Sequence, residues 1–310
     1  MRPASAIGHR FRFFSTDDLS DEARDGLDRF YTRPCTARRC VDLFTSVVLP
    51  KPASTFIEPS AGSGAFLRCL EDTYGRQHTV VGLDVRPAAE PTCETPIETT
   101  DFLQWTPPPT FNSSDLYFVG NPPFGRCSSL AIKFIKRIAS FSHAKAIGFI
   151  LARSFKKESM QKRIPLDWHL QLSEDLPDAA FVTPSGADRK VKTVFQVWSR
   201  GVEDRKYGPP PEPIGWRFIK RSESTSRTVC ISNCGSGSGK VRDQVGTWTE
   251  STHFFIHVDE SIVSREAFLT AAGRAEYPSA YDVVAAPSIS KPEFTRGLNR
   301  ALWRDEVPSK

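Results

Sequence analysis

The sequence predicts an α/β fold: a doubly wound, mainly parallel sheet with an antiparallel terminal hairpin, followed by a small α+β region. Apolar runs alternate with segments of helical periodicity from residue 54 to residue 155, the pattern of a parallel sheet with helices on both faces. Two later apolar runs, at 167–177 and 191–200, are joined by a polar, basic loop, which favours a hairpin. Clustered proline and glycine at 201–213 then mark a boundary.

The elements of the larger region follow from the apolar periodicities. In chain order we expect a helix around 40–48, a strand and a glycine-rich turn in 54–66, a helix at 66–75, strands at 78–87 and 115–124, a helix at 129–141 and a strand at 144–155. Parallel strands gather their carboxyl ends at one edge of a sheet, and ligands bind at that edge. Residues that end these strands are therefore the first candidates for a site.

The C-terminal region has fewer sequence patterns that predict secondary structure. Strands are expected at 227–232 and 252–258 from their β-branched and aromatic residues. Ser290 is expected to cap a helix, with Pro292 in the first turn and Glu293 at capping-box spacing. We therefore divide the chain into a flexible N-terminal segment at 1–29, a catalytic domain at 30–202 and an accessory or target-recognition region at 203–310.

Composition narrows the class of protein. The 310 residues are 39% hydrophobic, enough for a buried core, and no apolar run approaches the roughly 18 residues of a membrane span. The N-terminus lacks a secretory core, and its arginines fit a mitochondrial presequence or a plain tail, of which we expect the tail. Seven cysteines without paired spacing indicate a reducing compartment. An intracellular protein, cytoplasmic or nuclear, is expected.

The charged residues indicate a partner, whereas the histidines and cysteines indicate no metal site. Residues 126–163 hold ten basic side chains and one acid, within a chain of net charge +5, the footprint of a phosphate-rich partner. No metal is expected, because the six histidines lack ligand spacing and Cys230 with Cys234 has no second ligand pair. No feature specifies an oligomeric state.

The glycine-rich turn is not a dinucleotide fingerprint. After Gly62 and Gly64 the third glycine position is Leu67, and a carboxylate at Glu58, at the mouth of the turn, would repel a pyrophosphate. That carboxylate suits a cationic ligand instead. Twenty residues after Gly64, Asp84 ends the next strand, where an acid accepts hydrogen bonds from ribose hydroxyls.

A nucleoside with a positive charge satisfies these features together. Asp101 and Phe102 follow at the next strand end, where they are expected to bond an adenine amino group and pack against its ring. S-adenosylmethionine combines a ribose, an adenine, an ammonium and a sulfonium, so we predict it as the cofactor. The expected cofactor contacts are Glu58, Pro59, Ala61, Gly62, Gly64, Asp84, Asp101, Phe102 and Asn121.

The segment Asn121-Pro122-Pro123-Phe124 is expected to grip a planar amine. The prolines end the preceding strand and keep the loop rigid. Asn121 offers a side-chain oxygen, Pro122 a backbone carbonyl and Phe124 a flat apolar face. Two acceptors that hold the amine hydrogens aim the nitrogen lone pair at a methyl donor, so positioning suffices and no strong base is required. We predict these four residues as the catalytic loop.

The segments FYTRP, EPSAGSGAF, GLDV, DFL and NPPF, in that order over residues 30–200, resemble the class I S-adenosylmethionine-dependent methyltransferases that modify exocyclic amines. The resemblance is greatest to the gamma-type N6-adenine nucleic-acid methyltransferases. It implies a Rossmann-like fold and contacts of Tyr31, Thr32 and Pro34 to the methionine end of the cofactor. Arg33 is an insertion in that motif.

The acceptor implied by the resemblance is adenine in nucleic acid. Its base would be extruded and stacked on Phe124. Phosphate or base contacts are expected from Lys156, Lys157, Lys162, Phe181, Arg189 and Lys190. Some adenosine methyltransferases that act at messenger-RNA cap ends share NPPF, and DNA-modifying relatives usually carry a longer recognition domain, which favours RNA over DNA.

Two alternatives remain open. Methyltransferases of protein glutamine amides are similar but carry Asn-Pro-Pro-Tyr, and Phe124 and the basic cluster weigh against them. A catalytically silent nucleic-acid-binding subunit would have no need to keep Gly62, Gly64, Asp84 and Asn121 together.

Overall fold

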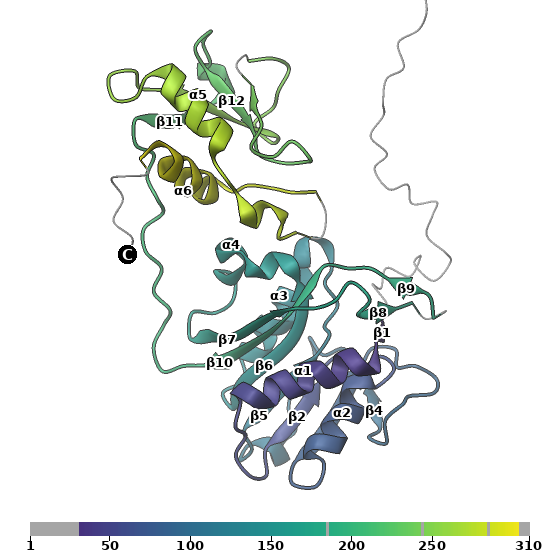
Figure 1. Cartoon of the computed structure of the whole chain (residues 1–310). Coiled ribbons are helices and arrows are strands. Elements are labelled where there is room, and N and C mark those ends of the chain that lie inside the picture. The colour runs from purple at the N-terminus through teal and green to yellow at the C-terminus, as the bar shows by residue number, and fades with distance from the viewer. Residues whose placement is uncertain (1–30, 184–185, 243–244, 284–285, 304–310) are drawn as a thin grey trace, which may run out of the picture.

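The computed structural model describes residues 31–183, 186–242, 245–283 and 286–303. The expected N-terminal segment at 1–29 lies outside these residues. A seven-stranded sheet organises the larger part of the chain, and a four-stranded sheet organises the C-terminal part (Figure 1). In spatial order the larger sheet contains β4 (Ile97–Thr99), β3 (Thr79–Asp84), β2 (Thr55–Glu58), β5 (Leu116–Gly120), β6 (Ala144–Ala152), β10 (Thr193–Arg200) and β7 (Trp168–Asp175).

The larger sheet is doubly wound. Strands β4, β3, β2, β5 and β6 run parallel, whereas β10 runs antiparallel to both β6 and β7. From β2 the chain builds the sheet first through β3 and β4 and then, in the other direction, through β5 and β6, so the order reverses between β2 and β5. The predicted Rossmann-like sheet with its antiparallel terminal strands is confirmed.

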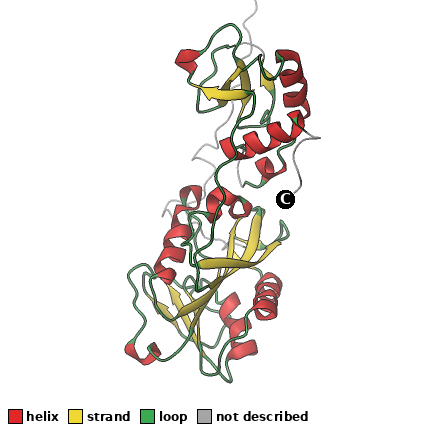
Figure 2. Cartoon of the chain, turned by 90° about the vertical axis from the view of Figure 1, so that its left-hand side faces the viewer, coloured by secondary structure: helices red, strands yellow, loops and turns green. Residues whose placement is uncertain are grey.

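Helices cover both faces of this sheet (Figure 2). One face packs against α1 (Pro34–Val47) and α2 (Ala65–Tyr74), and the other against α3 (Ser129–Ala139). Strand β5 shows why: Tyr117 and Val119 join the first apolar layer, while Leu116 and Phe118 join the second. Successive side chains of a strand point to opposite faces, so a strand buried on both sides is apolar throughout.

The remaining elements of the larger part are short. They are the small antiparallel sheet of β1 (Tyr31–Thr32), β8 (Phe181–Val182) and β9 (Asp188–Arg189), helix α4 (Glu158–Gln161), and the 3₁₀ turns η3 (Pro109–Phe111), η4 (Arg126–Ser128) and η5 (Arg153–Lys156). Among the described residues, no helix has both the length and the apolarity that crossing a bilayer would need.

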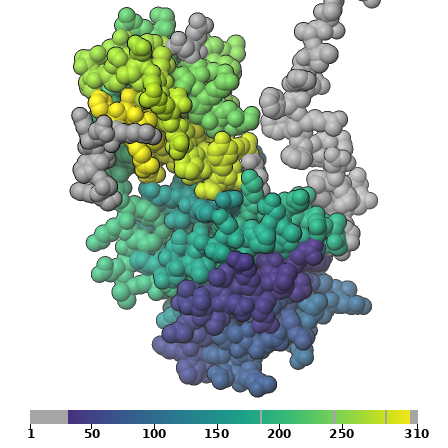
Figure 3. Space-filling model, in the orientation of Figure 1, coloured from purple at the N-terminus to yellow at the C-terminus, as the bar shows by residue number. Residues whose placement is uncertain are grey.

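The C-terminal part has its own core. Its antiparallel sheet has the order β11 (Trp216–Ile219), β14 (His253–Val258), β12 (Val229–Ser232) and β13 (Val241–Arg242), accompanied by α5 (Arg265–Arg274), α6 (Lys291–Leu302), η6 (Arg221–Glu223) and η7 (Pro278–Tyr281). Ser290 and Glu293 form the predicted capping box at the start of α6. Phe268, Phe294 and Leu298 bury the helices against the sheet, and the space-filling view shows this part as a separate lobe (Figure 3).

A buried lysine joins the two parts. Lys157 follows η5, beyond the carboxyl end of β6, and is only 8% exposed. Its Nζ donates a hydrogen bond of 2.8 Å to the carbonyl of Ser288 and lies 3.6 Å from Oε1 of Glu293. The expectation that Lys157 contacts phosphate is therefore wrong, because its charge is enclosed and compensated within the chain.

Other charges of the predicted basic cluster are also paired. The ion pairs are Arg153 with Asp282 at 3.1 Å, Lys156 with Asp175 at 3.0 Å, Lys162 with Glu158 at 2.6 Å and Arg296 with Glu158 at 3.4 Å. Two of these pairs, like that of Lys157, connect the C-terminal part to η5 and α4. Arg153 and Lys157 of the basic cluster thus fix the C-terminal part at the carboxyl edge of the larger sheet, whereas Lys156 and Lys162 pair within the larger part.

Removing the buried cation is expected to destabilise the junction. Lys157→Met should lower the free energy of unfolding by about 3–5 kcal/mol, because it leaves the charge of Glu293 buried without a counter-ion. Lys162→Met, which breaks a half-exposed pair, should cost no more than about 0.5 kcal/mol. Urea unfolding of both variants measures the difference, and equal small effects would contradict a buried ion pair at the junction.

Candidate active site

A cavity of about 310 Å³ opens where the order of the larger sheet reverses. The loops that follow β2, β3, β4 and β5 supply most of its wall, because these neighbouring parallel strands end at the same edge. The predicted site residues that line it are Tyr31, Pro59, Gly62, Asp84, Asp101, Phe102, Asn121, Pro122, Pro123 and Phe124. The fold therefore brings the cofactor and catalytic loops of the sequence analysis into one site.

The glycine-rich turn depends on two left-handed glycines. Gly62 has φ +53° and Gly64 has φ +83°, values that other residues adopt only with strain. A Cβ on Gly64 would also lie 2.5 Å from Sγ of Cys93. Gly64 begins α2, and the Gly62 N–H donates a hydrogen bond of 2.8 Å to Oδ2 of Asp84. The turn and the acid after β3 thus form one unit.

Asp84 keeps acceptor capacity toward the cavity. Its other oxygen accepts the N–H of Arg86 at 2.7 Å. Each oxygen of an ionised carboxylate has two lone pairs, so both can accept a further hydrogen bond from a ligand. This arrangement fits a carboxylate that receives two neighbouring ribose hydroxyls.

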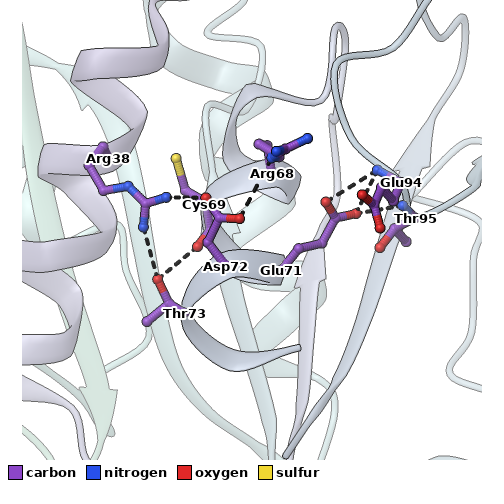
Figure 4. A network of polar contacts seen from close by, with 8 residues as sticks. All are labelled: Arg38, Arg68, Cys69, Glu71, Asp72, Thr73, Glu94 and Thr95. Atoms are coloured by element: carbon purple, nitrogen blue, oxygen red, sulfur yellow. Dashed lines mark hydrogen bonds and ion pairs between the residues drawn. The ribbon is translucent and has the colours of Figure 1, made fainter. Parts of the chain in front are cut away.

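Hydrogen bonds to the glycine-rich turn and to α2 anchor the loop after β3. The N–H groups of Ala88 and Thr92 donate to the carbonyls of Gly62 and Ser63, at 3.0 and 2.8 Å. Farther along, Glu71 of α2 accepts the N–H groups of Glu94 and Thr95, and Arg38 of α1 ties α2 to its neighbour through Asp72 and Thr73 (Figure 4). These contacts hold Val85 and Arg86 at the cavity wall.

The next strand end contributes Asp101 and Phe102. Oδ1 of Asp101 accepts the N–H of Leu103 at 2.9 Å, and the residue is exposed. Phe102 is 1% exposed, and its ring lies among Trp105, Phe118 and Phe134. Phe102 is therefore mainly a core residue that also lines the cavity, and little of its ring is exposed for the expected packing against adenine.

The catalytic loop places an unpartnered acceptor at the cavity. Oδ1 of Asn121 is buried and has no hydrogen-bond partner, although Asn121 lines the cavity. A buried acceptor without a donor costs about 1–3 kcal/mol, so this oxygen is suited to a donor that a ligand brings. Among the described residues, no hydrogen bond reaches the Pro122 carbonyl either.

The backbone around the catalytic loop is held firmly. The Ser60 hydroxyl donates a hydrogen bond of 3.1 Å to the Asn121 carbonyl, which joins this loop to the glycine-rich turn. The Phe124 carbonyl accepts the N–H of Leu130 at 3.1 Å, at the start of α3. Between them, Cys127 and Ser128 have φ of +51° and +58°, a strained conformation that often accompanies functional loops.

Glu58 lies beneath the turn. Its side chain is 2% exposed, and Oε2 accepts the N–H of Leu67 at 3.0 Å. Burial raises the pKa of this carboxyl well above its usual range; the Leu67 hydrogen bond opposes the shift and the charge of Asp84 adds to it. The expected position of Glu58 at the mouth of the turn is corrected: it does not line the cavity.

The raised pKa gives a test of this burial. As pH rises above about 4.5, the unfolded chain loses the Glu58 proton while the folded protein keeps it, so stability falls. Glu58→Gln replaces the titrating carboxyl group with an amide, so residue 58 no longer contributes to the pH dependence of stability. Without added cofactor, the stability of the variant relative to the parent should therefore increase with pH, by at most about 1.4 kcal/mol per pH unit. Urea unfolding of both proteins between pH 4.5 and neutrality measures the difference, and a constant difference would contradict it.

Several predicted residues lie outside the cavity wall. Thr32 and Ala61 are buried behind it, and Gly64 shapes the turn. Phe181 is 1% exposed in the core that α1 and α2 cover, so the expectation that it faces an extruded base is wrong. The cavity residues that the sequence analysis missed are Ser60, Val85, Arg86, Leu103, Leu130 and Phe134. Three of them, Ser60, Val85 and Leu103, directly adjoin predicted residues, and that adjacency was the available signal.

The glycine-rich turn, the acid after β3 and the Asn-Pro-Pro-Phe loop after β5 lie at the reversal point of a doubly wound sheet. This architecture is a Rossmann-like doubly wound fold, in which ligands bind at that point. The chain is similar in fold to the 23S rRNA methyltransferase ErmE, with 18% identity, TM-score 0.40, 58% of this chain and 73% of that chain covered. It is also similar to TrmN from Thermus thermophilus, with 14% identity, TM-score 0.36 and coverage of 54% and 48%.

A further similar structure is the plantazolicin methyltransferase BpumL in complex with SAH, with 10% identity, TM-score 0.35, 54% of this chain and 84% of that chain covered. No family model matches the chain, and no curated protein matches its sequence.

Proposed function

We propose that this protein transfers a methyl group from S-adenosylmethionine to an exocyclic amine, N6 of adenine in nucleic acid. The observation that carries the proposal is the buried, unpartnered Oδ1 of Asn121 at a cavity that also presents Asp84. An amide oxygen without a donor suits the N–H of an incoming amine, and the carboxylate suits a nucleoside sugar.

The residues of the cavity fit the cofactor. Asp84 offers one free acceptor site on each oxygen for the ribose hydroxyls, while Asp101 has a second oxygen for a donor on the adenine. Val85 and Leu103 give apolar walls. When bound, S-adenosylmethionine supplies an electrophilic methyl group on a sulfonium.

The catalytic loop would hold the acceptor nitrogen. Asn121 Oδ1 and the Pro122 carbonyl accept its two hydrogens, which disfavours delocalisation of the lone pair into the ring and directs it toward the methyl donor. The four loop residues 121–124 supply no base, and a proton released after transfer can leave to solvent. Phe124 is partly exposed at the cavity, where it can stack on the base.

Nucleic acid is favoured over a protein glutamine by Phe124 in place of tyrosine and by the positive net charge. RNA is favoured over DNA, because the NPPF segment resembles that of adenosine methyltransferases that act at messenger-RNA cap ends. A silent binding subunit would not require an unpartnered amide beside an intact cofactor turn.

Nucleoside mass spectrometry tests the proposal directly. The protein is incubated with isotopically labelled S-adenosylmethionine and, in parallel, with total RNA, total DNA or total protein. Labelled N6-methyladenosine from the RNA sample is the expected product. Label only in glutamine would move the acceptor to protein, and tight cofactor binding without any labelled product would contradict catalysis.

A further inference from the structure

The small sheet of β1, β8 and β9 borders the cavity. Tyr31 of β1 lines the cavity, and its ring packs on Gly62, where a Cβ would meet it at 3.3 Å. Tyr31 lies opposite Val182 of β8, which lies opposite Asp188 of β9. Residues paired across strands point to the same face of a sheet. One face of this small sheet therefore continues outward from the cavity.

The inserted Arg33 neutralises the acid on that face. Arg33 follows Tyr31 by two residues, so alternation keeps it on the same side, and its guanidinium forms an ion pair with Asp188. Its N–H also donates to the Ala180 carbonyl at 3.0 Å, just before β8. The insertion thus fixes the hairpin of β8 and β9 to the strand that carries Tyr31.

Two free cations extend the same face. Lys190 and Lys192 are exposed, while Val191 between them is 8% exposed, so the alternation persists beyond β9. Neither lysine has an acidic partner among the described residues, in contrast to Lys156, Lys157 and Lys162. The backbone here is anchored, because the N–H of Arg153 donates to the Lys192 carbonyl at 3.0 Å.

We propose that this hairpin face, defined by Tyr31, Val182, Lys190 and Lys192, is the surface on which the phosphate backbone of the acceptor nucleic acid lies as its base enters the cavity. The inference rests on the proposed function and replaces the paired lysines after β6 as the phosphate contacts. Residues two apart in an extended segment are separated by about 7 Å, so the two lysines meet separate phosphate groups.

Salt dependence of binding tests the proposal. A fluorescent single-stranded oligoadenosine RNA is titrated with the full chain at several salt concentrations. Each phosphate contact contributes about 0.7 to the slope of log affinity against log salt for a single strand. Lys190→Gln/Lys192→Gln should therefore flatten the slope by about 1.4 and leave S-adenosylmethionine affinity unchanged in calorimetry.

The control variant removes the same charge elsewhere. Lys51 and Lys145 both lie near Asp115, just before β5, at the opposite edge of the sheet. Lys51→Gln/Lys145→Gln should keep the slope of the parent. If Lys190→Gln/Lys192→Gln keeps the salt slope of the parent, or if both double variants flatten it equally, the proposal of the hairpin face is overturned.

A second pair of variants tests the role of Arg33. Arg33→Gln frees the charge of Asp188 on the hairpin face and should weaken RNA binding several-fold, and adding Asp188→Asn should restore it. A loss that Asp188→Asn does not restore would contradict the electrostatic role.

The two proposals fail in different ways. If the parent methylates RNA but the Lys190→Gln/Lys192→Gln variant has the same salt slope of RNA affinity, only the hairpin-face proposal is overturned. Salt-dependent RNA binding through these lysines without any methylation overturns only the proposed function.

Discussion

Asn121→Ala is expected to reduce methyl transfer at least 100-fold, an order of magnitude typical of losing one preorganised polar group at a reacting centre. The variant removes the unpartnered Oδ1 that we assign to the acceptor amine. Affinity for S-adenosylmethionine should change little, because we assign the Asn121 side chain to the acceptor amine in place of the cofactor contact expected from the sequence. Single-turnover methylation of RNA measures the first effect, and calorimetric titration of the cofactor measures the second.

Asn112→Ala is the matched control, because Asn112 is an exposed amide in the loop that precedes β5. It should retain the activity of the parent. Near-normal turnover of Asn121→Ala would show that the amine is not held by this oxygen, and the catalytic assignment of the loop would have to be abandoned.

Asp84→Ala is expected to weaken cofactor binding by about 2–4 kcal/mol, equivalent to roughly 30- to 1000-fold. The variant loses the proposed hydrogen bonds to the ribose. It also leaves the N–H groups of Gly62 and Arg86 without their acceptor, so the glycine-rich turn loses one of its anchors. Calorimetric titration with S-adenosylmethionine measures the change.

Asp84→Asn separates these two contributions, because it keeps one acceptor oxygen and removes the negative charge. We expect an intermediate affinity from it, and parental affinity from Asp178→Ala, which truncates an exposed aspartate. A folded Asp84→Ala protein that binds S-adenosylmethionine like the parent would refute the cofactor assignment of this cavity.

The residues that sequence reasoning located well are those that end strands. Asp84 and Asn121 both follow apolar runs, and parallel neighbours in one sheet place their ends at one edge. The alternating pattern therefore predicted both the fold and the meeting of the loops. Gly62 was recognisable as well, because a strand that turns directly into a helix requires an unusual backbone conformation that favours glycine.

Burial at the site was harder to predict. Glu58 and Phe102 stand at the expected strand ends, yet one lies beneath the turn and the other beneath the cavity. Both outcomes depend on neighbours from other elements: a Cβ on Gly120 of β5 would meet the Glu58 side chain at 3.0 Å, and Phe102 packs on Phe134 of α3. Local pattern does not contain these contacts.

The sequence alone determined the doubly wound sheet, the order of its loops and the polar groups that those loops offer, because strand periodicity and turn chemistry are local properties. Only the tertiary structure decided which charges remain available. Lys157 and Lys190 are equivalent in a count of basic residues, but Lys157 pairs with Glu293 in the junction and Lys190 stays exposed. The pairing of a charge is set by groups that lie far away along the chain and meet it only on folding.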